Sequence, residues 1–323
     1  MHIKARHYFT TGRIALIFLL IYSLLPSRFS PAHDFVRRED MISHLQFSKS
    51  NNDSCEIGVV DNRSMTFRYP DLGSIDSAED STALRLGISP GGRWRPTRCR
   101  ARVDVAIVVP YRGRARQLVT FLAYMHPFLQ SQQLDYQIIV VEQSPGGGDF
   151  NRGKLFNVGF VELASSSSSS NFSCFVFHDV DLLPQSRDNV YACGRRSPRH
   201  MSSAVNTFRY TLPWPESFGG VVALSEGQFR DVNGFANVYE GWGGEDSDMR
   251  DRVVSKGYEI LRFERDIAMY YMLAHEKEPP SPSRYERLAG ASRRFSSDGL
   301  SNLEYRVLAR ESRPLYLWLL VDV

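Results

Sequence analysis

Apolar residues occur in short runs through the middle of the chain, and their spacing predicts strands that alternate with helices. Nearly continuous apolar runs are typical of strands buried on both faces of a sheet. Four such runs lie at 103–109, 138–141, 174–177 and 221–224. Apolar residues at helical spacing follow the first two runs, at 118–129 and 156–163. This alternation predicts an α/β fold with a mostly parallel central sheet flanked by helices.

A further apolar run, 14–25, lies near the N-terminus and predicts a membrane segment. Basic residues precede the run and no charged residue interrupts it. This pattern predicts an uncleaved signal anchor at 14–27, with a cytoplasmic tail at 1–13 and the rest of the chain in the secretory lumen. The run is shorter than the roughly 20 residues that span a bilayer, so a cleaved signal peptide is the alternative. The following PSRFS lacks a small-x-small cleavage site, which favours the anchor.

The region after the anchor changes in character at about residue 91. Residues 28–90 are rich in Ser, Asp, Asn and Arg and poor in apolar periodicity, which predicts a luminal stem before a catalytic domain at 91–323. Glycosylation sequons begin at Asn52, Asn62 and Asn171 and agree with a luminal address. The chain has 4 cysteines, an even number that can close two disulfides in an oxidising compartment; free buried thiols are the alternative.

Composition and charge exclude several classes of function. With 323 residues and 42% hydrophobic content, the chain can bury one large core. Its net charge of +3 is small and dispersed, which argues against a nucleic-acid partner. No P-loop motif is present, and the glycines at 146–148 are consecutive rather than spaced as in a dinucleotide fingerprint. The sequence therefore favours neither a P-loop NTPase nor a dinucleotide-binding enzyme.

The stretch 218–252 carries the densest set of candidate chemical groups. Glycines surround Trp242, and the acidic run that begins with Glu245 and Asp246 opens a predicted helix. Glycine permits tight turns and close approach to a ligand, and the flat face of a tryptophan suits a sugar ring. A carboxylate in the first helical turn faces the positive end of the helix dipole and is available as a base. The alternative is a glycine-rich loop that ends in an acidic helix cap.

Polar residues also follow two of the predicted strands, where ligands bind in open α/β sheets. Tyr111, Arg112 and Arg114 follow the first strand. The guanidinium groups of the arginines suit phosphates, and the tyrosine ring suits the base of a nucleotide. Asp179 and Asp181 follow the third strand, and two aspartates at i and i+2 can face a divalent cation that also holds a diphosphate. Solvated loop charges and an aspartate-capped turn are the alternatives.

These motifs together resemble the β-1,4-galactosyltransferase family of Golgi type II membrane enzymes. The resemblance covers about residues 91–323, and its segments occur in one order: VAIVVPYRGR, FNRGKLFNVGF, FVFHDVDLLP, FGGVVALS, NGFANVYEGWGGEDSDMRDR and SDGLSNLEYRVL. It implies a GT-A glycosyltransferase fold, a UDP-sugar donor, Mn²⁺ as cofactor, and a single-pass type II protein with its catalytic domain in the Golgi lumen.

The resemblance also implies roles for individual residues. Asp246 would be the base, and Glu245 would orient the sugar. The donor would be bound by Pro110, Tyr111, Arg112, Arg114, Phe150, Arg152, Asp179, Val180 and Trp242. The metal would be ligated by Asp181, Met272 and His275. The acceptor, a glycan with terminal GlcNAc, would be bound by Gly243, Gly244, Arg284, Tyr285 and Leu288. The disulfides would join Cys55 to Cys99 and Cys174 to Cys193.

Departures from the family pattern leave more than one function open. Ser247 replaces a residue that is usually acidic, and Trp214 and Ser217 occupy positions where the family often has tyrosines. A small residue at 217 would give room for the N-acetyl group of UDP-GalNAc. The leading hypothesis is a β-1,4-galactosyltransferase acting on terminal GlcNAc. The alternatives are a β-1,4-N-acetylgalactosaminyltransferase and, in another class, a glycan-binding protein without turnover.

Overall fold

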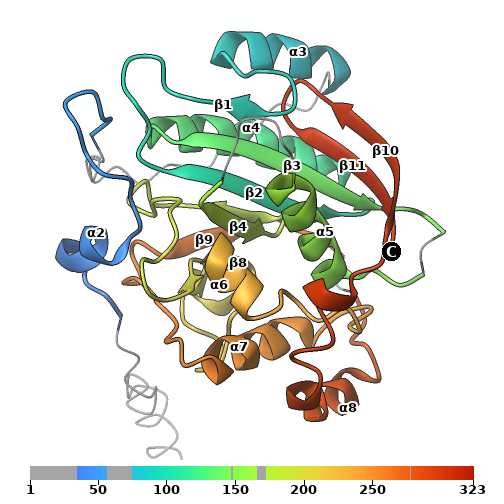
Figure 1. Cartoon of the computed structure of the whole chain (residues 1–323). Helices are drawn as coiled ribbons and strands as arrows, with labels where there is room; N and C mark the ends of the chain where they lie inside the picture. The colour runs from blue at the N-terminus through green and yellow to red at the C-terminus, as the bar shows by residue number, and fades with distance from the viewer. Residues whose placement is uncertain (1–34, 57–74, 147, 166–171, 277) are drawn as a thin grey trace, which may run out of the picture. The chain divides into compact units, whose positions relative to one another are not determined.

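A mixed β-sheet whose central strands run parallel organises the fold (Figure 1). In this computed structural model the described residues are 35–56, 75–146, 148–165, 172–276 and 278–323. The sheet order is β10-β11-β3-β2-β4-β8-β6, and β1 also pairs with β3. The strands are β1 (Arg93–Trp94), β2 (Asp104–Tyr111), β3 (Asp135–Gln143), β4 (Cys174–His178), β6 (Arg199–His200), β8 (Val221–Ser225), β10 (Arg306–Ser312) and β11 (Leu317–Asp322).

The four predicted strands are present as β2, β3, β4 and β8. Strands β11, β3, β2 and β4 are mutually parallel, as predicted for the centre of the sheet. The outer pairs β4–β8, β6–β8, β10–β11 and β1–β3 are antiparallel. An apolar run shows that a strand is buried but not which way it runs, so the sequence could not reveal the direction of β8.

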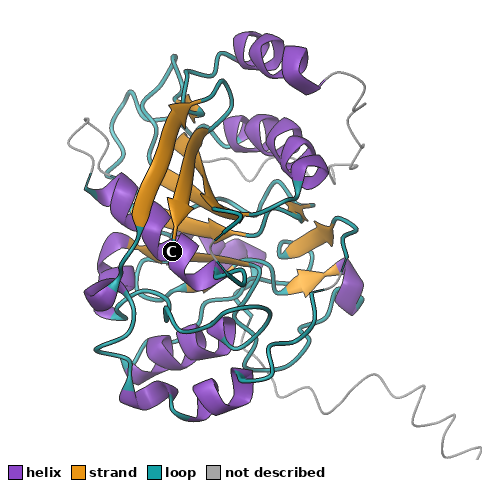
Figure 2. Ribbon diagram, turned by 90° about the vertical axis from the view of Figure 1, so that its right-hand side faces the viewer, coloured by secondary structure: helices purple, strands orange, loops and turns teal. Residues whose placement is uncertain are grey.

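Two long helices cover opposite faces of this sheet (Figures 1 and 2). They are α4 (Ala115–Ser131) and α5 (Arg152–Ala164), which match the two predicted helices. Alternate residues of β2 point to opposite faces, so Ile107 packs in the core with α4 while Val108 packs in the core with α5. At Gly159 of α5 an added Cβ would lie 2.3 Å from Val108 Cγ1, so this glycine lets helix and sheet approach closely.

Smaller elements complete the layers and carry the loops of interest. Helices α6 (Glu226–Asp231) and α7 (Glu245–Ser255) join the core on the α5 face through Phe229, Met249 and Val253. A second sheet has the order β5-β9-β7. The remaining elements are β5 (Leu182–Pro184), β7 (Ala204–Val205), β9 (Met269–Met272), α2 (Met41–His44), α3 (Ile75–Leu86), α8 (Arg284–Ala289), and the 3-10 turns η1 (Arg38–Asp40), η2 (Asn206–Phe208), η3 (Ala291–Arg293) and η4 (Leu300–Asn302).

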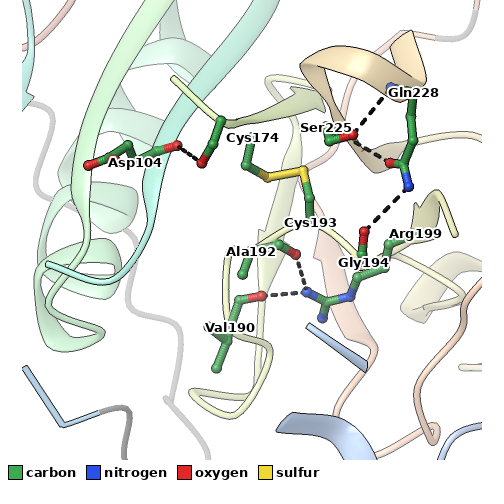
Figure 3. Close-up of a disulfide and its surroundings, with 10 residues drawn as sticks. Asp104, Cys174, Val190, Ala192, Cys193, Gly194, Arg199, Ser225 and Gln228 are labelled. Atoms are coloured by element: carbon green, nitrogen blue, oxygen red, sulfur yellow. Dashed lines mark hydrogen bonds between the residues drawn. A yellow bond between two sulfur atoms is a disulfide. The ribbon is translucent and has the colours of Figure 1, made fainter. Parts of the chain in front are cut away.

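Both expected disulfides are formed. Cys55 is bonded to Cys99, and Cys174, the first residue of β4, is bonded to Cys193. Figure 3 shows the second bond beside Arg199, whose guanidinium donates hydrogen bonds to the carbonyls of Val190 and Ala192. The disulfide therefore ties the start of β4 to the segment that leads into β6.

The compact unit of the structure includes part of the predicted stem. This unit extends over Phe35–Val323. Met41 and Leu45, whose neighbours in the sequence are mostly polar, are fully buried in its core. The predicted anchor at 14–27 and the sequon residues Asn62 and Asn171 lie outside the described residues. Within the described part of the chain, none of the helices has the length and apolar character to span a membrane.

Candidate active site

The predicted catalytic carboxylates converge on the guanidinium of Arg152, the first residue of α5. Arg152 Nε donates to Asp179 Oδ1 at 2.6 Å, and Nη1 donates to Asp246 Oδ1 at 2.6 Å and to Glu245 Oε1 at 3.3 Å. Asp179 directly follows β4, whereas Glu245 and Asp246 open α7. One arginine therefore joins the loop at the carboxyl end of β4 to the acidic start of α7, which the sequence placed far apart.

Burial and like charge shape the protonation of this cluster. Burial, together with the neighbouring carboxylates, raises the pKa of Asp179 to about 7 despite the opposing effect of Arg152. Burial and the charge of Asp246 likewise raise the pKa of Glu245 to about 7. Burial alone would lower the pKa of Arg152, but Asp179, Asp246 and Glu245 outweigh it and raise the pKa above its usual range. Three carboxylates sharing one guanidinium leave an excess of negative charge, which suits a divalent cation.

The three predicted metal ligands lie together beside this cluster. Asp181 Oδ2 lies 3.1 Å from His275 Nε2, and the Asp181 carbonyl accepts a hydrogen bond from Leu273 N at 2.7 Å. Met272 on β9 is paired in register with Leu182, the neighbour of Asp181. Strand pairing of β5 with β9 therefore brings Asp181, Met272 and His275 to one place, a proximity that sequence spacing does not reveal.

The contacts of His275 fit a cation between its ring and Asp181. His275 Nδ1 lies 2.7 Å from the Glu276 carbonyl, which can only accept, so Nδ1 carries the hydrogen. In the neutral ring, Nε2 then presents a lone pair to the Asp181 carboxylate, and a cation or a proton is needed between two acceptors. Carboxylate oxygen and imidazole nitrogen suit Mn²⁺, whereas the Met272 thioether is a soft ligand that Mn²⁺ does not favour. In the described residues no group of three or more His, Cys, Asp or Glu side chains is arranged to hold a metal.

The predicted donor-binding residues 110–114, 150 and 180 lie at the ends of β2 and β4 and on the segment before α5. Pro110 and Tyr111 end β2, and Val180 is buried between the two aspartates. Arg112 Nη1 donates to the Gly148 carbonyl at 2.7 Å, and its guanidinium lies 5.3 Å from the centre of the Phe150 ring. Arg114 Nη2 donates to the Glu276 carbonyl at 3.3 Å, next to His275. Arg114 thus lies close to the Asp181–His275 pair, and Arg112 lies against the Gly148–Phe150 segment.

The predicted acceptor-binding residues come from two segments that touch. Gly243 and Gly244 have φ of 102° and 106°, a backbone region that glycine adopts without strain. An added Cβ on Gly243 would lie 3.1 Å from Arg284 Cδ, and the Trp242 carbonyl accepts from Ser281 N at 3.0 Å. Trp242 and Tyr285 are 55% and 69% exposed, so both rings are available to a ligand. Leu288 is half-buried on α8.

The predicted donor-selectivity residues lie on the segment before β8, and this segment reaches Asp246. Trp214 is 48% exposed, Ser217 is buried, and Ser217 N donates to the Trp214 carbonyl at 3.0 Å. An added Cβ on Gly219 would lie only 2.2 Å from Asp246 Oδ2. Gly219 carries no sequence signal of this contact, because residue type alone does not distinguish a glycine at a close contact from a glycine in a turn.

A polar depression elsewhere on the described surface is not part of this site. It lies at the amino ends of β2 and β3, and its lining includes Arg93, Arg95, Asp104 and Asp135. Arg93 donates to both oxygens of Asp135, at 3.0 and 3.2 Å. Arg93 and Asp135 thus pair with each other at the opposite end of the parallel strands from Asp179.

Comparison with known proteins agrees with the sequence motifs. Family models described as "N-terminal region of glycosyl transferase group 7" and "N-terminal domain of galactosyltransferase" match residues 67–194 and 199–276. Beta-1,4-galactosyltransferase 4 of Rattus norvegicus is 44% identical over 234 residues, which are 72% of this chain and 67% of that protein. The chain belongs to the β-1,4-galactosyltransferase family.

Other members of the β-1,4-galactosyltransferase family are similar over 239 residues. Beta-1,4-galactosyltransferase 3 of Bos taurus is 43% identical over 239 residues, and beta-1,4-galactosyltransferase 1 of Homo sapiens is 44% identical over 239 residues. The match covers 73% of this chain but only 59% of the bovine relative.

Solved structures support the fold. The catalytic domain of Drosophila beta1,4galactosyltransferase 7 in complex with xylobiose has a TM-score of 0.58 at 24% identity, covering 68% of this chain and 93% of that chain. A mutant of the Drosophila enzyme in complex with manganese, UDP-Gal and xylobiose has a TM-score of 0.55. The predicted GT-A fold of the β-1,4-galactosyltransferases is confirmed.

Proposed function

We propose that the protein is an inverting β-1,4-galactosyltransferase that moves galactose from UDP-Gal to the 4-hydroxyl of a terminal GlcNAc. Membership of the family supports this activity, as does the Drosophila relative whose structure holds manganese, UDP-Gal and an oligosaccharide. The observation that carries the proposal is the position of Asp246, which shares Arg152 with Asp179 and so lies beside the aspartates expected to face the donor.

In this proposal the donor lies against the carboxyl ends of β2 and β4. Arg112 and Arg114 bind its phosphates, while Tyr111 and Phe150 bind the uridine side. Asp181 and His275, with Met272, would hold Mn²⁺. When bound, this cation supplies positive charge that stabilises the departing UDP.

The chain's own residues would then carry out a single displacement. Asp246 accepts the proton of the acceptor 4-hydroxyl as that oxygen forms a bond to the anomeric carbon. The bond from the anomeric carbon to the UDP oxygen breaks at the same time, so configuration inverts. Glu245 orients the sugar, and Arg284, Tyr285 and Leu288 bind the acceptor beside Trp242, Gly243 and Gly244. The exposed Trp242 ring covers the donor and limits attack by water.

The test is transfer itself. The full chain is incubated with UDP-Gal, a GlcNAc glycoside and Mn²⁺, and the linkage of the product is determined by NMR. A β-1,4-linked product that depends on Mn²⁺ supports the proposal. UDP release without a disaccharide, or a product with another linkage, contradicts it.

Ser217 favours a second candidate, a β-1,4-N-acetylgalactosaminyltransferase. Ser217 lies two residues from Gly219, whose Cα faces Asp246, so a small side chain there would leave room for an N-acetyl group. Comparing kcat/KM for UDP-Gal and UDP-GalNAc on one acceptor separates the two. A glycan-binding protein without turnover ranks below both because Asp181 and Asp246 are present and close to Arg152 or His275.

We also propose that residues 14–27 anchor the protein in the Golgi membrane with its catalytic domain in the lumen. The two formed disulfides support an oxidising compartment. Asn52 is exposed, so removal of a glycan from this residue by a glycosidase tests whether the catalytic domain faces the lumen. A mobility shift is expected for the wild-type chain and not for an Asn52→Gln chain that also lacks the other two sequons.

A further inference from the structure

Arg262 is buried beside the segment 214–219, which carries the donor-selectivity residues, and it donates hydrogen bonds to the backbone of this segment. It is 7% exposed, and its Nη2 donates to the Ser217 carbonyl at 2.8 Å and to the Pro215 carbonyl at 3.2 Å. Its Nε lies 3.2 Å from His200 Nδ1. A single buried guanidinium therefore holds two carbonyls of the segment 214–219 and one histidine of β6.

His200 extends this contact to Gly219. A guanidinium has only donors, so His200 Nδ1 must accept from Arg262 and His200 Nε2 must carry the ring hydrogen. That hydrogen points to the Gly219 carbonyl at 3.0 Å, where Ser202 Oγ also donates at 3.0 Å. Burial and the charge of Arg262 lower the pKa of His200 to about 3, which keeps the ring neutral and its tautomer fixed. Arg262 is thus hydrogen-bonded to three carbonyls of the segment, directly at residues 215 and 217 and through His200 at residue 219.

The end of this segment touches the proposed catalytic groups. Gly219 lies against Asp246 Oδ2, as the 2.2 Å approach of an added Cβ shows. The next carbonyl, of Gly220, accepts from Asp179 N at 3.1 Å and from Arg152 Nη2 at 3.5 Å. A shift of the segment would therefore change the space between Ser217 and the carboxylates that face the donor sugar.

The hydrogen-bond partners of Arg262, rather than its electrostatics, distinguish it from Arg199. Within the described part of the chain, no carboxylate oxygen lies within the 4.0 Å of a salt bridge to Arg262, and burial lowers its pKa to about 10. A buried charge without a carboxylate in direct contact is costly to a fold unless its donors are well used. Burial also lowers the pKa of Arg199, one residue before His200, but Arg199 bonds the carbonyls of Val190 and Ala192 (Figure 3), which are not part of the segment 214–219.

We propose that Arg262, through the carbonyls of Pro215 and Ser217 and through His200, is a positioning residue that sets the donor selectivity of the site. The inference rests on the proposed function, because it assumes that the donor sugar lies between Ser217 and Asp246. Without these hydrogen bonds the backbone of the segment 214–219 changes position. The site then no longer distinguishes the hydroxyl of galactose from the N-acetyl group of N-acetylgalactosamine.

The test compares Arg262→Lys and Arg262→Met with Arg199→Lys in the full chain. Lysine keeps the charge but cannot bond two carbonyls and His200 together. In the Arg262 variants, kcat/KM for the preferred donor should fall at least about tenfold through KM, while the value for the other donor changes less than about threefold. Arg199→Lys should lower the melting temperature but leave the ratio of the two donors unchanged. Acceptor KM should stay within about twofold of wild type in all variants.

A second measurement keeps the inference separate from the proposed function. Equilibrium binding of UDP-Gal and UDP-GalNAc with Mn²⁺ and without acceptor needs no turnover. If the wild-type chain binds donors but transfers neither sugar, the proposed function fails, and a changed binding ratio in Arg262→Lys still supports the positioning role. If the Arg262 and Arg199 variants lose stability alike and all keep the wild-type donor ratio, the inference is overturned. Should Arg262→Met fail to fold, His200→Gln, which breaks the link to Gly219, takes its place under the same criterion.

Discussion

The guanidinium of Arg152 donates to the carboxylate of Asp246 at 2.6 Å, although the two residues belong to different helices, α5 and α7. The same guanidinium bonds Asp179 from the loop after β4. Asp246 is therefore held at a fixed place relative to the expected donor site even though it follows a glycine-rich loop. With 37% of its side chain exposed, Asp246 is still open to an incoming acceptor. This combination of anchoring and access is what a general base requires.

Replacing Asp246 by asparagine should abolish most transfer and leave donor binding intact. Asparagine keeps the shape of the side chain but cannot take a proton, so kcat should fall by about 10²–10⁴-fold, the usual contribution of general base catalysis. The dissociation constant for UDP-Gal should change little, because the donor contacts remain. Asp251→Asn is the matched control, since it removes a carboxylate of the same helix that pairs with the adjacent Arg250. Near-normal kcat in Asp246→Asn would exclude the base role.

Gly219→Ala should displace Asp246 without removing any polar group. The added methyl would lie 2.2 Å from Asp246 Oδ2 and 2.7 Å from Asp246 Cγ, so the carboxylate must move. A misplaced base of this kind typically costs about 10²-fold in rate, and we expect that loss in kcat. Gly227→Ala on α6 is the control because nothing lies within 4 Å of its added Cβ. Equal kcat in both alanine variants would show that Asp246 need not occupy its observed place.

The sequence predicted the elements of the fold because burial leaves a local trace. Each of these traces spans only about ten residues of the chain. They are the apolar runs of β2, β3, β4 and β8 and the apolar stripes of α4 and α5. The direction of β8 and its place beside β4 depend on pairing between distant segments, which leaves no such trace. The same holds for Met41 and Leu45, two apolar residues whose burial is decided by the surface they meet.

The functional site, like the fold, was predictable from the sequence only where its residues form a local pattern. Asp179, Asp181 and Asp246 could be selected from the sequence because acidic residues after a buried strand or at a helix start are recognisable patterns. The convergence of Asp179 and Asp246 on Arg152 was not recognisable, because contacts between segments distant in the sequence leave no local pattern. His200 and Arg262 were missed altogether, because their role arises from hydrogen bonds to carbonyls of a loop rather than from any motif.

Removing the His275 imidazole should weaken the metal site. His275→Ala takes away the nitrogen that faces Asp181 Oδ2 at 3.1 Å, so half-maximal activity should need at least about tenfold more Mn²⁺. Glu276→Ala is the neighbouring control: its side chain is exposed, and its carbonyl, which accepts from His275 Nδ1, is retained. A Mn²⁺ titration of UDP-Gal binding gives a readout that does not depend on turnover. Superimposable titrations for wild type and His275→Ala would remove His275 from the ligand set.

Acid should destabilise the protein through histidines that are buried in the neutral state. His126 Nδ1 bonds the Tyr136 hydroxyl and Nε2 bonds the Leu315 carbonyl, both at 2.8 Å, and burial lowers the pKa of His126 to about 4. An unfolded chain takes up this proton near pH 6.5 whereas the folded chain does not. The contribution of His126 to stability is therefore constant above about pH 6.5 and falls between pH 6.5 and 4, since the unfolded state binds more protons at this residue there. At 1.36 kcal/mol per pKa unit, His126 accounts for at most about 3 kcal/mol of this loss.

His126→Gln isolates this contribution. Glutamine does not titrate, so its free energy of unfolding, measured with urea at pH 7 and at pH 4.5, should fall less on acidification than that of the wild type. The difference should approach 2–3 kcal/mol, about two pKa units of linkage. His178 and His200, whose pKa values burial lowers to about 3, still titrate in this variant and keep part of the acid sensitivity. His44→Gln removes an exposed histidine and should leave the wild-type slope unchanged. Equal slopes for His126→Gln and wild type would mean that His126 is protonated within the fold, and that its bond to the Leu315 carbonyl rather than its neutrality determines its place in the core.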